Sequence, residues 1–159
     1  MEDYIYVTAN YKLQPLASHK HRLNVDRTMS VDLHTQPLDK LVTSIFETLG
    51  FVTKHPALVI KHPLADSRLS HVIKQVGSSK DEKDKYIGVI VRDWKRIVGV
   101  GQIHKAEELL RACPELNKVI IVSSMGFSYS ATRVAKKIGV GLISRGELIS
   151  LLLKRIEIF

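Results

Sequence analysis

The chain has 159 residues, 45% of them hydrophobic, and a formal charge of +8 at pH 7. This length and apolar content fit one globular domain, so a second independent domain is not expected. No apolar run reaches the roughly 20 residues of a transmembrane helix, and no signal-peptide pattern is present, so we expect a cytoplasmic protein that does not bind membranes. The basic charge favours an anionic partner, and nucleic acid is the commonest one.

Metal and disulfide chemistry has little support in the composition. Cys113 is the only cysteine, which excludes an intramolecular disulfide and a cysteine-based zinc site, and we expect it to be a buried thiol. His19 and His21 form the only close histidine pair, but no carboxylate is placed beside them. We expect them to be solvent-exposed loop residues.

Residues 1–36 are the least regular part of the sequence. Alternating patterns near 4–8 and 29–35 predict two strands with a basic loop between them. The pair forms either a hairpin on the sheet or an arm that reaches a partner. We therefore divide the chain into an extension, 1–36, and a domain, 37–159.

The first half of the domain begins with a helix. Pro37 suits the first helical turn, apolar residues recur at three- and four-residue spacing up to Leu49, and Gly50 suits the end. Three strands are predicted next, joined by a polar connection over 77–85. Their ranges are 51–60, with an edge or bulge at Pro56, then 70–76, and then 86–92 with an extension toward Lys95.

The second half alternates helices and strands. Helices are predicted over 102–112, from Ser128 to Gly139, and from 148 to about 155; strands are predicted over 119–122 and at 142–143. Ser144 and Glu147 have the spacing of a capping box before the last helix. The order of elements predicts an α/β three-layer sandwich, with a mixed central sheet and helices on both faces.

Two segments carry a family resemblance. They are Trp94-Lys-Arg-Ile-Val-Gly99, after the third predicted strand, and Ser123-Ser-Met-Gly-Phe-Ser-Tyr-Ser130, before a helix. Together with the element order, they resemble the catalytic domain of the Mrr-like restriction endonucleases, a branch of the PD-(D/E)XK nuclease superfamily, over about residues 37 to 154. The resemblance implies a restriction-endonuclease-like fold and a divalent metal held by an acidic residue on the second strand and by Glu/Gln-x-Lys on the third.

The metal-binding positions implied by the resemblance hold other residues. Ile90 stands at the Glu or Gln position and Arg92 at the Lys position, while Ser70 or His71 stands at the acidic one. Magnesium prefers anionic oxygen, which none of these supplies. The sequence predicts a catalytically degenerate site without a cofactor, and His55, His62 and His71 are candidates for the sheet face beside it.

An alternative keeps the enzyme active. Asp66, followed by Asp93-Trp94-Lys95, reproduces the Asp and Asp-x-Lys pattern of a Mg²⁺-dependent endonuclease. Strand alternation puts Asp93 and Lys95 on the face opposite to positions 90 and 92, so this reading needs a β-bulge near Arg92. Convergence of the three side chains distinguishes the two hypotheses.

The leading hypothesis is a domain of nuclease fold that binds DNA or RNA through the phosphate backbone. Its candidate contacts are Arg92, Lys95, Arg96 and Arg133, with the hydroxyls of Ser124, Ser128 and Ser130 at a helix start. Arginine can fork onto a phosphate, although Arg92 pairing with Asp66 is an alternative. Ser128 is equally a helix cap, and Phe127 is expected in the core.

A third hypothesis is a protein-interaction or scaffold subunit. Ile156, Ile158 and Phe159 are too apolar for a freely solvated tail. They either cover a second copy or another partner, or pack within the monomer.

Overall fold

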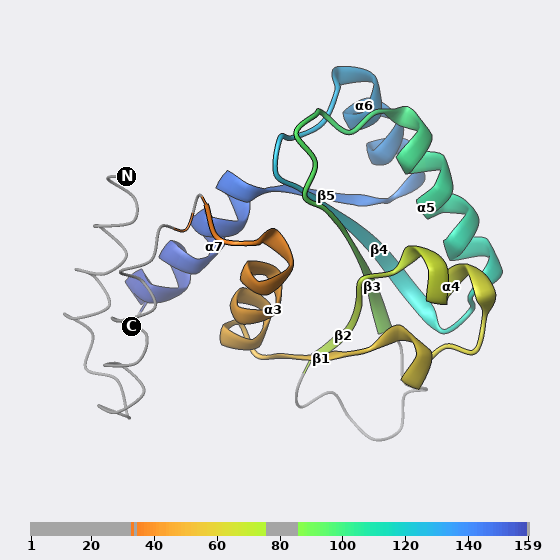
Figure 1. The fold of residues 1–159 in the computed structure, drawn as a ribbon, viewed down its shortest axis with the longest axis horizontal. Helices are drawn as coiled ribbons and strands as arrows, with labels where there is room; N and C mark the ends of the chain where they lie inside the picture. Colours follow the sequence, from red (N-terminus) through yellow and green to blue (C-terminus); the bar gives the residue numbers. More distant parts are fainter. Residues whose placement is uncertain (1–32, 34, 76–85, 159) are drawn as a thin grey trace.

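The computed structural model describes residues 33, 35–75 and 86–158. Within them, one five-stranded sheet lies between two layers of helices (Figure 1). The predicted α/β sandwich is therefore confirmed. The strands proposed for 1–36 and the connection 77–85 lie outside the described residues, apart from the end of the extension at Leu33 and 35–36. Across the described part of the chain, no helix is long and apolar enough to cross a membrane.

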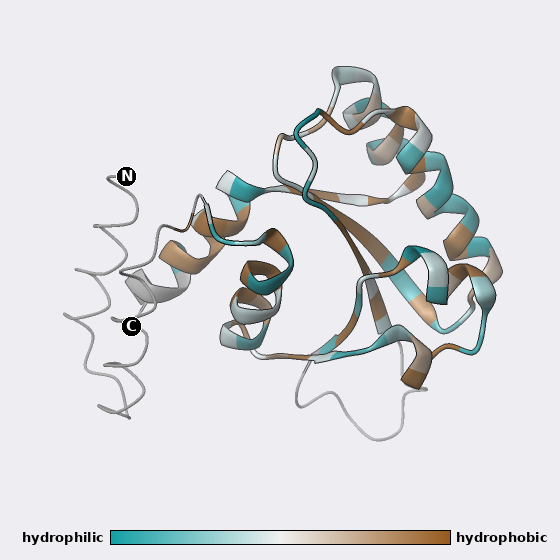
Figure 2. Cartoon of the chain, in the orientation of Figure 1, coloured by the Kyte–Doolittle hydropathy of each residue, from teal (hydrophilic) through white to brown (hydrophobic). Residues whose placement is uncertain are grey.

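The sheet is antiparallel at one side and parallel at the other. Neighbouring strands follow sequence order: β1 (Phe51–Lys54), β2 (His71–Gln75), β3 (Tyr86–Arg92), β4 (Leu116–Ser123) and β5 (Gly141–Ser144). The first three alternate in direction, whereas β3, β4 and β5 are parallel. Parallel neighbours need a crossover, which the intervening helices provide. Figure 2 shows β3 and β4 largely in the colours of apolar residues, as expected for strands covered on both faces.

One face of the sheet is covered by α3 (Leu38–Thr48) and α7 (Arg145–Ile158). The apolar positions predicted for the first helix are buried, except Leu49 at its C-cap, which is partly buried. Gly50 follows with a φ of +93°, a left-handed conformation that favours glycine. Ser144 and Glu147 form the predicted capping box at the start of α7: each backbone N–H donates to the other side chain, at 3.3 and 3.2 Å. The sequence predicts these helix ends because each depends on only a few neighbouring residues.

The opposite face is covered by α4 (Pro63–Arg68), α5 (Val100–Ala112) and α6 (Tyr129–Ile138). Ser128 caps α6 by accepting from the Ala131 N–H at 3.1 Å, as predicted. Cys113 is fully buried in this core, and burial raises the pKa of its thiol. The expectation of a buried thiol is confirmed.

The segment between β1 and β2 corrects the predicted strand over 51–60. The strand stops at Lys54, and η1 (Pro56–Leu58), a 3-10 turn, and then α4 follow. Each begins at a His-Pro pair: proline presets the first helical φ, and the preceding imidazole accepts a backbone N–H. His55 and His62 are thus helix caps and do not line the sheet face, so that expectation was wrong for both.

Smaller differences concern element ends. β3 ends at Arg92 and does not extend to Lys95, while α5 and β4 begin two and three residues earlier than predicted. Such shifts are ordinary, because tertiary packing sets the last residue of an element.

Candidate functional site

The carboxyl end of β3 keeps a regular register. Its pairing with β4 is continuous from Ile87 to Arg92, and the one irregularity lies between Tyr86 and Ile87. Ile87, Val89 and Val91 therefore pack toward α3 and α7, and Ile90 packs toward α5 and α6. The bulge near Arg92 that an Asp93-x-Lys95 site requires is absent.

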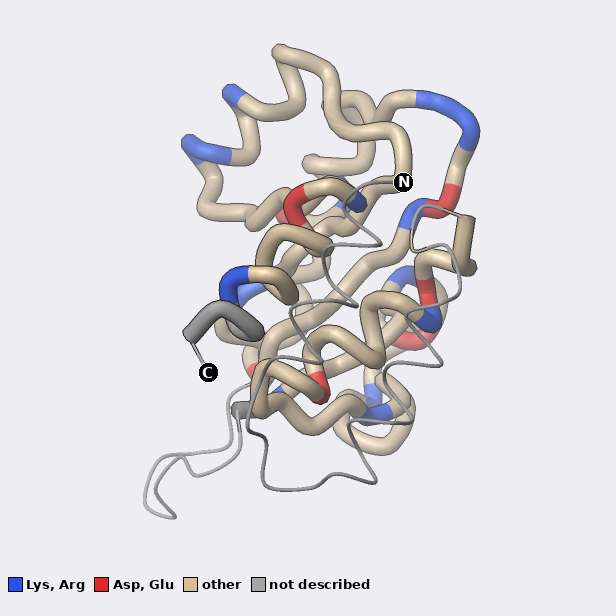
Figure 3. The backbone as a smooth tube through the Cα atoms, turned by 90° about the vertical axis from the view of Figure 1, so that its left-hand side faces the viewer, with Lys and Arg blue, Asp and Glu red and all other residues tan. Residues whose placement is uncertain are grey.

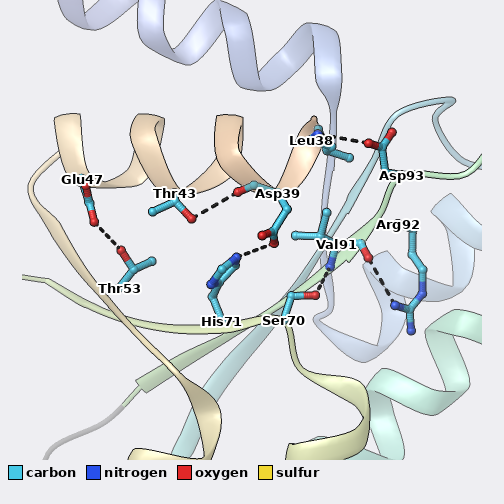
Figure 4. A network of polar contacts seen from close by, with 10 residues as sticks. All are labelled: Leu38, Asp39, Thr43, Glu47, Thr53, Ser70, His71, Val91, Arg92 and Asp93. Carbon is cyan, nitrogen blue, oxygen red and sulfur yellow. Dashed lines mark hydrogen bonds and ion pairs between the residues drawn. The ribbon is translucent and has the colours of Figure 1, made fainter. Parts of the chain in front are cut away.

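The position that the family resemblance assigns to a Glu or Gln ligand is apolar. Ile90 is 2% exposed, within the core under α5. Ser70 lies beside it, since extending the β2–β3 register by one residue sets Ser70 opposite Ile90. Its N–H donates to the Val89 carbonyl at 2.8 Å, and its Oγ accepts from the Val91 N–H at 3.0 Å (Figure 4).

His71, the other candidate for the acidic position, points to the opposite face of the sheet. Its Nε2 lies 2.6 Å from Asp39 Oδ1 on α3, with the imidazole N–H donating (Figure 4). This side chain ties β2 to α3. It does not face Ile90, so the expectation that it lines the same sheet face was also wrong.

The residues that the resemblance assigns to the three metal-binding positions do not fit a magnesium ion. They provide a buried alkyl group at Ile90, a hydroxyl at Ser70 that already accepts a backbone N–H, and a cation at Arg92. Within the described ranges, no three His, Cys, Asp or Glu side chains gather as a metal site would require. Hard divalent cations need anionic oxygen ligands, which this position lacks.

Asp93 forms a structural network on the α3 face. Its Oδ2 accepts the backbone N–H of Leu38 at 3.1 Å, and its Oδ1 lies 3.5 Å from Arg145 Nη2 (Figure 4 shows the first contact). Arg145 also donates to the carbonyls of Leu33 and Gln36, at 2.9 and 2.7 Å. Pro37, the residue at the N-cap of α3, has no capping side chain, so Asp93 caps the helix from 55 residues away.

The structure does not bring Asp66, Asp93 and Lys95 together. Asp66 is exposed on α4, in the helical layer opposite α3, whereas Asp93 faces α3 and Lys95 is exposed in the following loop. The cap made by Asp93 had no sequence signal, because its partner lies far away in the chain.

Arg92 is half-buried on the α5 side of the sheet. Its Nε donates to Gln102 Oε1 at 3.2 Å, its Nη1 donates to the Val91 carbonyl at 3.3 Å, and its guanidinium lies 5.2 Å from the ring centre of Trp94. No carboxylate of the described residues forms an ion pair with it, so the alternative pairing with Asp66 does not occur. Burial lowers the pKa of the guanidinium, because the charged form loses solvation.

Two loops join at this end of the sheet: 93–99 after β3 and 124–128 after β4. Val98 pairs with Phe127, and backbone bonds link Val98 with Gly126 and with Ser128, each at 3.0 Å. Ser124 Oγ donates to the Trp94 carbonyl at 2.8 Å. The hydroxyls of Ser124 and Ser128 therefore hold the loop and the helix cap, while Phe127 packs against the core as expected.

Basic side chains surround the two loops. Lys95 and Arg96 are exposed on the first, and Arg133 is exposed on α6 beside Ser130. A shallow hollow of about 220 Å³ is lined by Ser130, Arg133, Val134 and Lys137. Lys137 was not predicted as a site residue, although its spacing of four from Arg133 places it on the same face of the helix. Figure 3 shows mainly basic positions at the upper end of the molecule, where α6 and these loops lie.

The charge of this surface is strongly one-sided. Residues 92–99 and 124–138 contain six basic residues and one acidic residue, and that one, Asp93, is paired with Arg145. We call the six the basic surface; they are Arg92, Lys95, Arg96, Arg133, Lys136 and Lys137. Such a surface attracts polyanions.

The apolar C-terminal residues extend the last helix. α7 continues to Ile158, so Ile156 and Ile158 lie in a helix and not in a tail, while Phe159 is outside the described residues. Leu151, on the same helix, is 36% exposed. A homodimer or partner contact through this end stays a prediction.

Two solved structures have this fold. A protein of unknown function, AF1548, has a TM-score of 0.55 at 17% identity, with 77% of this chain and 66% of that chain covered. The DNA modification-dependent restriction endonuclease AspBHI has a TM-score of 0.51 at 8% identity, with 99% of this chain covered. The matched region is 38% of AspBHI. The fold is thus a mixed α/β, restriction-endonuclease-like domain.

The sequence is more specific about the family. A family model for the Mrr catalytic domain, described as restriction endonuclease, matches residues 32–152. No curated protein has significant similarity to the sequence. The chain belongs to the Mrr-type restriction endonuclease catalytic-domain family, as the resemblance in the sequence indicated.

Proposed function

We propose that this chain is a DNA-binding domain of the restriction endonuclease family whose metal-dependent cleavage activity has been lost. The observation that carries the proposal is Arg92, a half-buried cation without a carboxylate partner among the described residues, at the position where the family has its lysine. An uncompensated, partly desolvated charge is unfavourable in the free protein. A bound phosphate removes that penalty.

The geometry of Arg92 supports a phosphate ligand. Its Nε and Nη1 are held by Gln102 and by the Val91 carbonyl, and Nη2 forms no hydrogen bond with the described residues. Trp94 packs against the guanidinium plane and restricts its movement. A preorganised guanidinium loses little entropy when it donates to a phosphate oxygen, and such charge-assisted bonds are the strong ones.

The remaining contacts of the proposed interface come from exposed side chains. Lys95, Arg96 and Arg133 supply charge, and Ser130, beside the α6 hollow, supplies a hydroxyl donor. Ser124 and Ser128 contribute by holding the loops in place. Because phosphate contacts carry no base information, we expect binding with little sequence preference and a steep dependence on salt.

Loss of catalysis follows in this proposal from the replaced ligands. Ile90 offers no metal ligand, and Asp93, the nearest carboxylate in sequence, is committed to α3 and Arg145. A water molecule at this position would lack a metal to lower its pKa.

The test combines binding and cleavage. Fluorescence anisotropy of a labelled 30-base-pair duplex is measured from 50 to 300 mM salt, and the same duplex is incubated with Mg²⁺ or Mn²⁺. We expect log Kd to rise linearly with log salt and no metal-dependent cleavage. Arg133→Ala should weaken binding, whereas Arg111→Ala, an exposed arginine paired with Glu107 near the far end of α5, should not.

The other outcomes identify the alternatives. Cleavage that requires a metal and is lost in Asp93→Ala would restore the active-endonuclease hypothesis. Absence of any salt-sensitive binding would remove the nucleic-acid function and leave the protein-interaction hypothesis.

A further inference from the structure

Exposed apolar side chains are concentrated at the two joined loops. Six large hydrophobic residues of the described chain are exposed, and three of them are Ile97 at 57%, Met125 at 55% and Tyr129 at 78%. Val98 pairs with Phe127, so the segments that carry them are neighbours. We call these three residues the apolar rim.

The basic surface contacts aromatic rings at the same loops. The guanidinium of Arg96 lies 4.7 Å from the ring centre of Trp94, and that of Arg133 lies 5.8 Å from the ring centre of Tyr129. An aromatic ring backed by an arginine, open to solvent and surrounded by cations, is the arrangement that stacks nucleobases in single-strand-binding proteins. Tyr129 is the most exposed of these rings.

We propose that the apolar rim binds unpaired nucleobases, with Tyr129 as the stacking platform, so that the domain prefers single-stranded or locally unpaired DNA to fully paired duplex. This inference rests on the proposed function and specifies its substrate. Phosphates contact the basic surface, while a splayed base covers the ring of Tyr129 and the side chains of Ile97 and Met125.

An unpaired nucleobase suits the apolar rim better than duplex DNA or an acidic protein does. A flat duplex presents phosphates and groove edges, which leave exposed apolar side chains without a partner, whereas an unpaired base offers its π-face. An acidic protein would satisfy the charge, but six basic residues without an unpaired acidic one suit a regular polyanion better.

Oligonucleotides that separate phosphates from bases test the proposal directly. Three 20-nucleotide probes are compared at one salt concentration: a mixed-sequence single strand, an abasic strand with the same number of phosphates, and the corresponding duplex. We expect the single strand to bind about tenfold more tightly than the abasic strand, and more tightly than the duplex, which is within the range for one stacked base. Equal affinity for all three would overturn the proposal.

Substitutions identify the platform. Tyr129→Ala should weaken single-strand binding by about tenfold and leave abasic binding unchanged, while Tyr129→Phe, which keeps the ring, should bind normally. Leu58→Ala is the matched control, since Leu58 is an 80% exposed apolar residue on the η1 turn, away from the loops. An unchanged single-strand affinity in Tyr129→Ala would contradict the assignment.

Tryptophan fluorescence gives a second measurement, which reports on the environment of the loops as well as on affinity. Trp94 is the only tryptophan of the chain and lies in the first loop, so its fluorescence reports on this region. We expect quenching by the single strand and little change with the abasic strand. If Arg133→Ala lowers affinity for every probe while Tyr129→Ala lowers none, the proposed DNA-binding function stands and this inference fails.

Discussion

Two consecutive residues at the end of β3, Arg92 and Asp93, show how differently the two faces of the sheet are used. Asp93 faces α3, where it caps the helix and pairs with Arg145. Arg92 faces the α5 side. Its guanidinium contacts a side-chain amide, a backbone carbonyl and an aromatic ring, and it has no anionic partner among the described residues. The charge of Asp93 is compensated within the fold, whereas that of Arg92 has no carboxylate partner among the described residues.

The difference teaches that alternation along a strand places adjacent residues in different environments. Residues of one parity belong to the α3 and α7 core, and those of the other parity face α5 and α6. A side chain on one face can therefore change while the network on the other face keeps the fold intact. Substitutions at Ile90, Asp93 and Arg92 test this separation, in order of decreasing expected effect on stability, with Ile97 and Asp66 as control positions.

Ile90→Gln should be the most destabilising change, by about 3 kcal/mol in the free energy of unfolding. It removes a buried side chain from the α5 core and places an amide among apolar side chains. Urea unfolding measures the loss. The family resemblance implies that an intact site holds Glu or Gln at this position. A stable Ile90→Gln variant would therefore contradict the burial of position 90 and indicate that it opens to a cleft.

The matched control for this change is Ile97→Gln. Ile97 is 57% exposed, so the same substitution should alter stability by less than about 0.5 kcal/mol.

Asp93→Ala should cost about 2 kcal/mol, because it removes the cap of α3 and the carboxylate partner of Arg145. Asp93→Asn keeps a hydrogen-bond acceptor for the Leu38 N–H and should recover about half of the loss. Thermal unfolding followed by circular dichroism gives both values.

Asp66→Ala distinguishes the capping role of Asp93 from a catalytic role shared by Asp66 and Asp93. Asp66 is exposed on α4, and its loss should change stability by less than about 0.5 kcal/mol. If Asp66 and Asp93 were metal ligands, both alanine variants would lose cleavage, and their stabilities would not need to differ. Equal stability of the two variants would therefore contradict the capping role of Asp93.

Arg92→Met should have the smallest effect on stability and a clear effect on binding. The substitution keeps the apolar stem and removes a charge that burial disfavours, so unfolding should change by less than about 0.5 kcal/mol. Affinity for duplex DNA should fall about tenfold, and the slope of log Kd against log salt should decrease by about one. Arg92→Lys should retain the slope.

A large loss of stability in Arg92→Met would show that Arg92 is a structural residue like Asp93. The distinction between the two faces would then disappear.

Sequence alone determined the features that are encoded locally. The helix after Pro37, the caps at Ser128 and Ser144 and the order of the main elements follow from local residue patterns, and the burial of Cys113 follows from its residue type. The Trp94–Gly99 segment carries the family resemblance, and the assignment of Ile90 and Arg92 to metal-binding positions stays a prediction. Both His-Pro turns were missed, although their signal was also local: the apolar residues around His55 favoured a strand, and no element was predicted at His62.

Tertiary structure alone decided which charges are compensated. The partner of Asp93 is 55 residues away and the partner of His71 is 32 residues away, and contacts at such separations leave no periodic trace in the sequence. The clustering of Ile97, Met125 and Tyr129 likewise arises because parallel strands end at one edge of the sheet and bring their loops together. Local spacing specifies helices and strands, whereas the packing of distant segments determines which side chains remain free to bind a ligand.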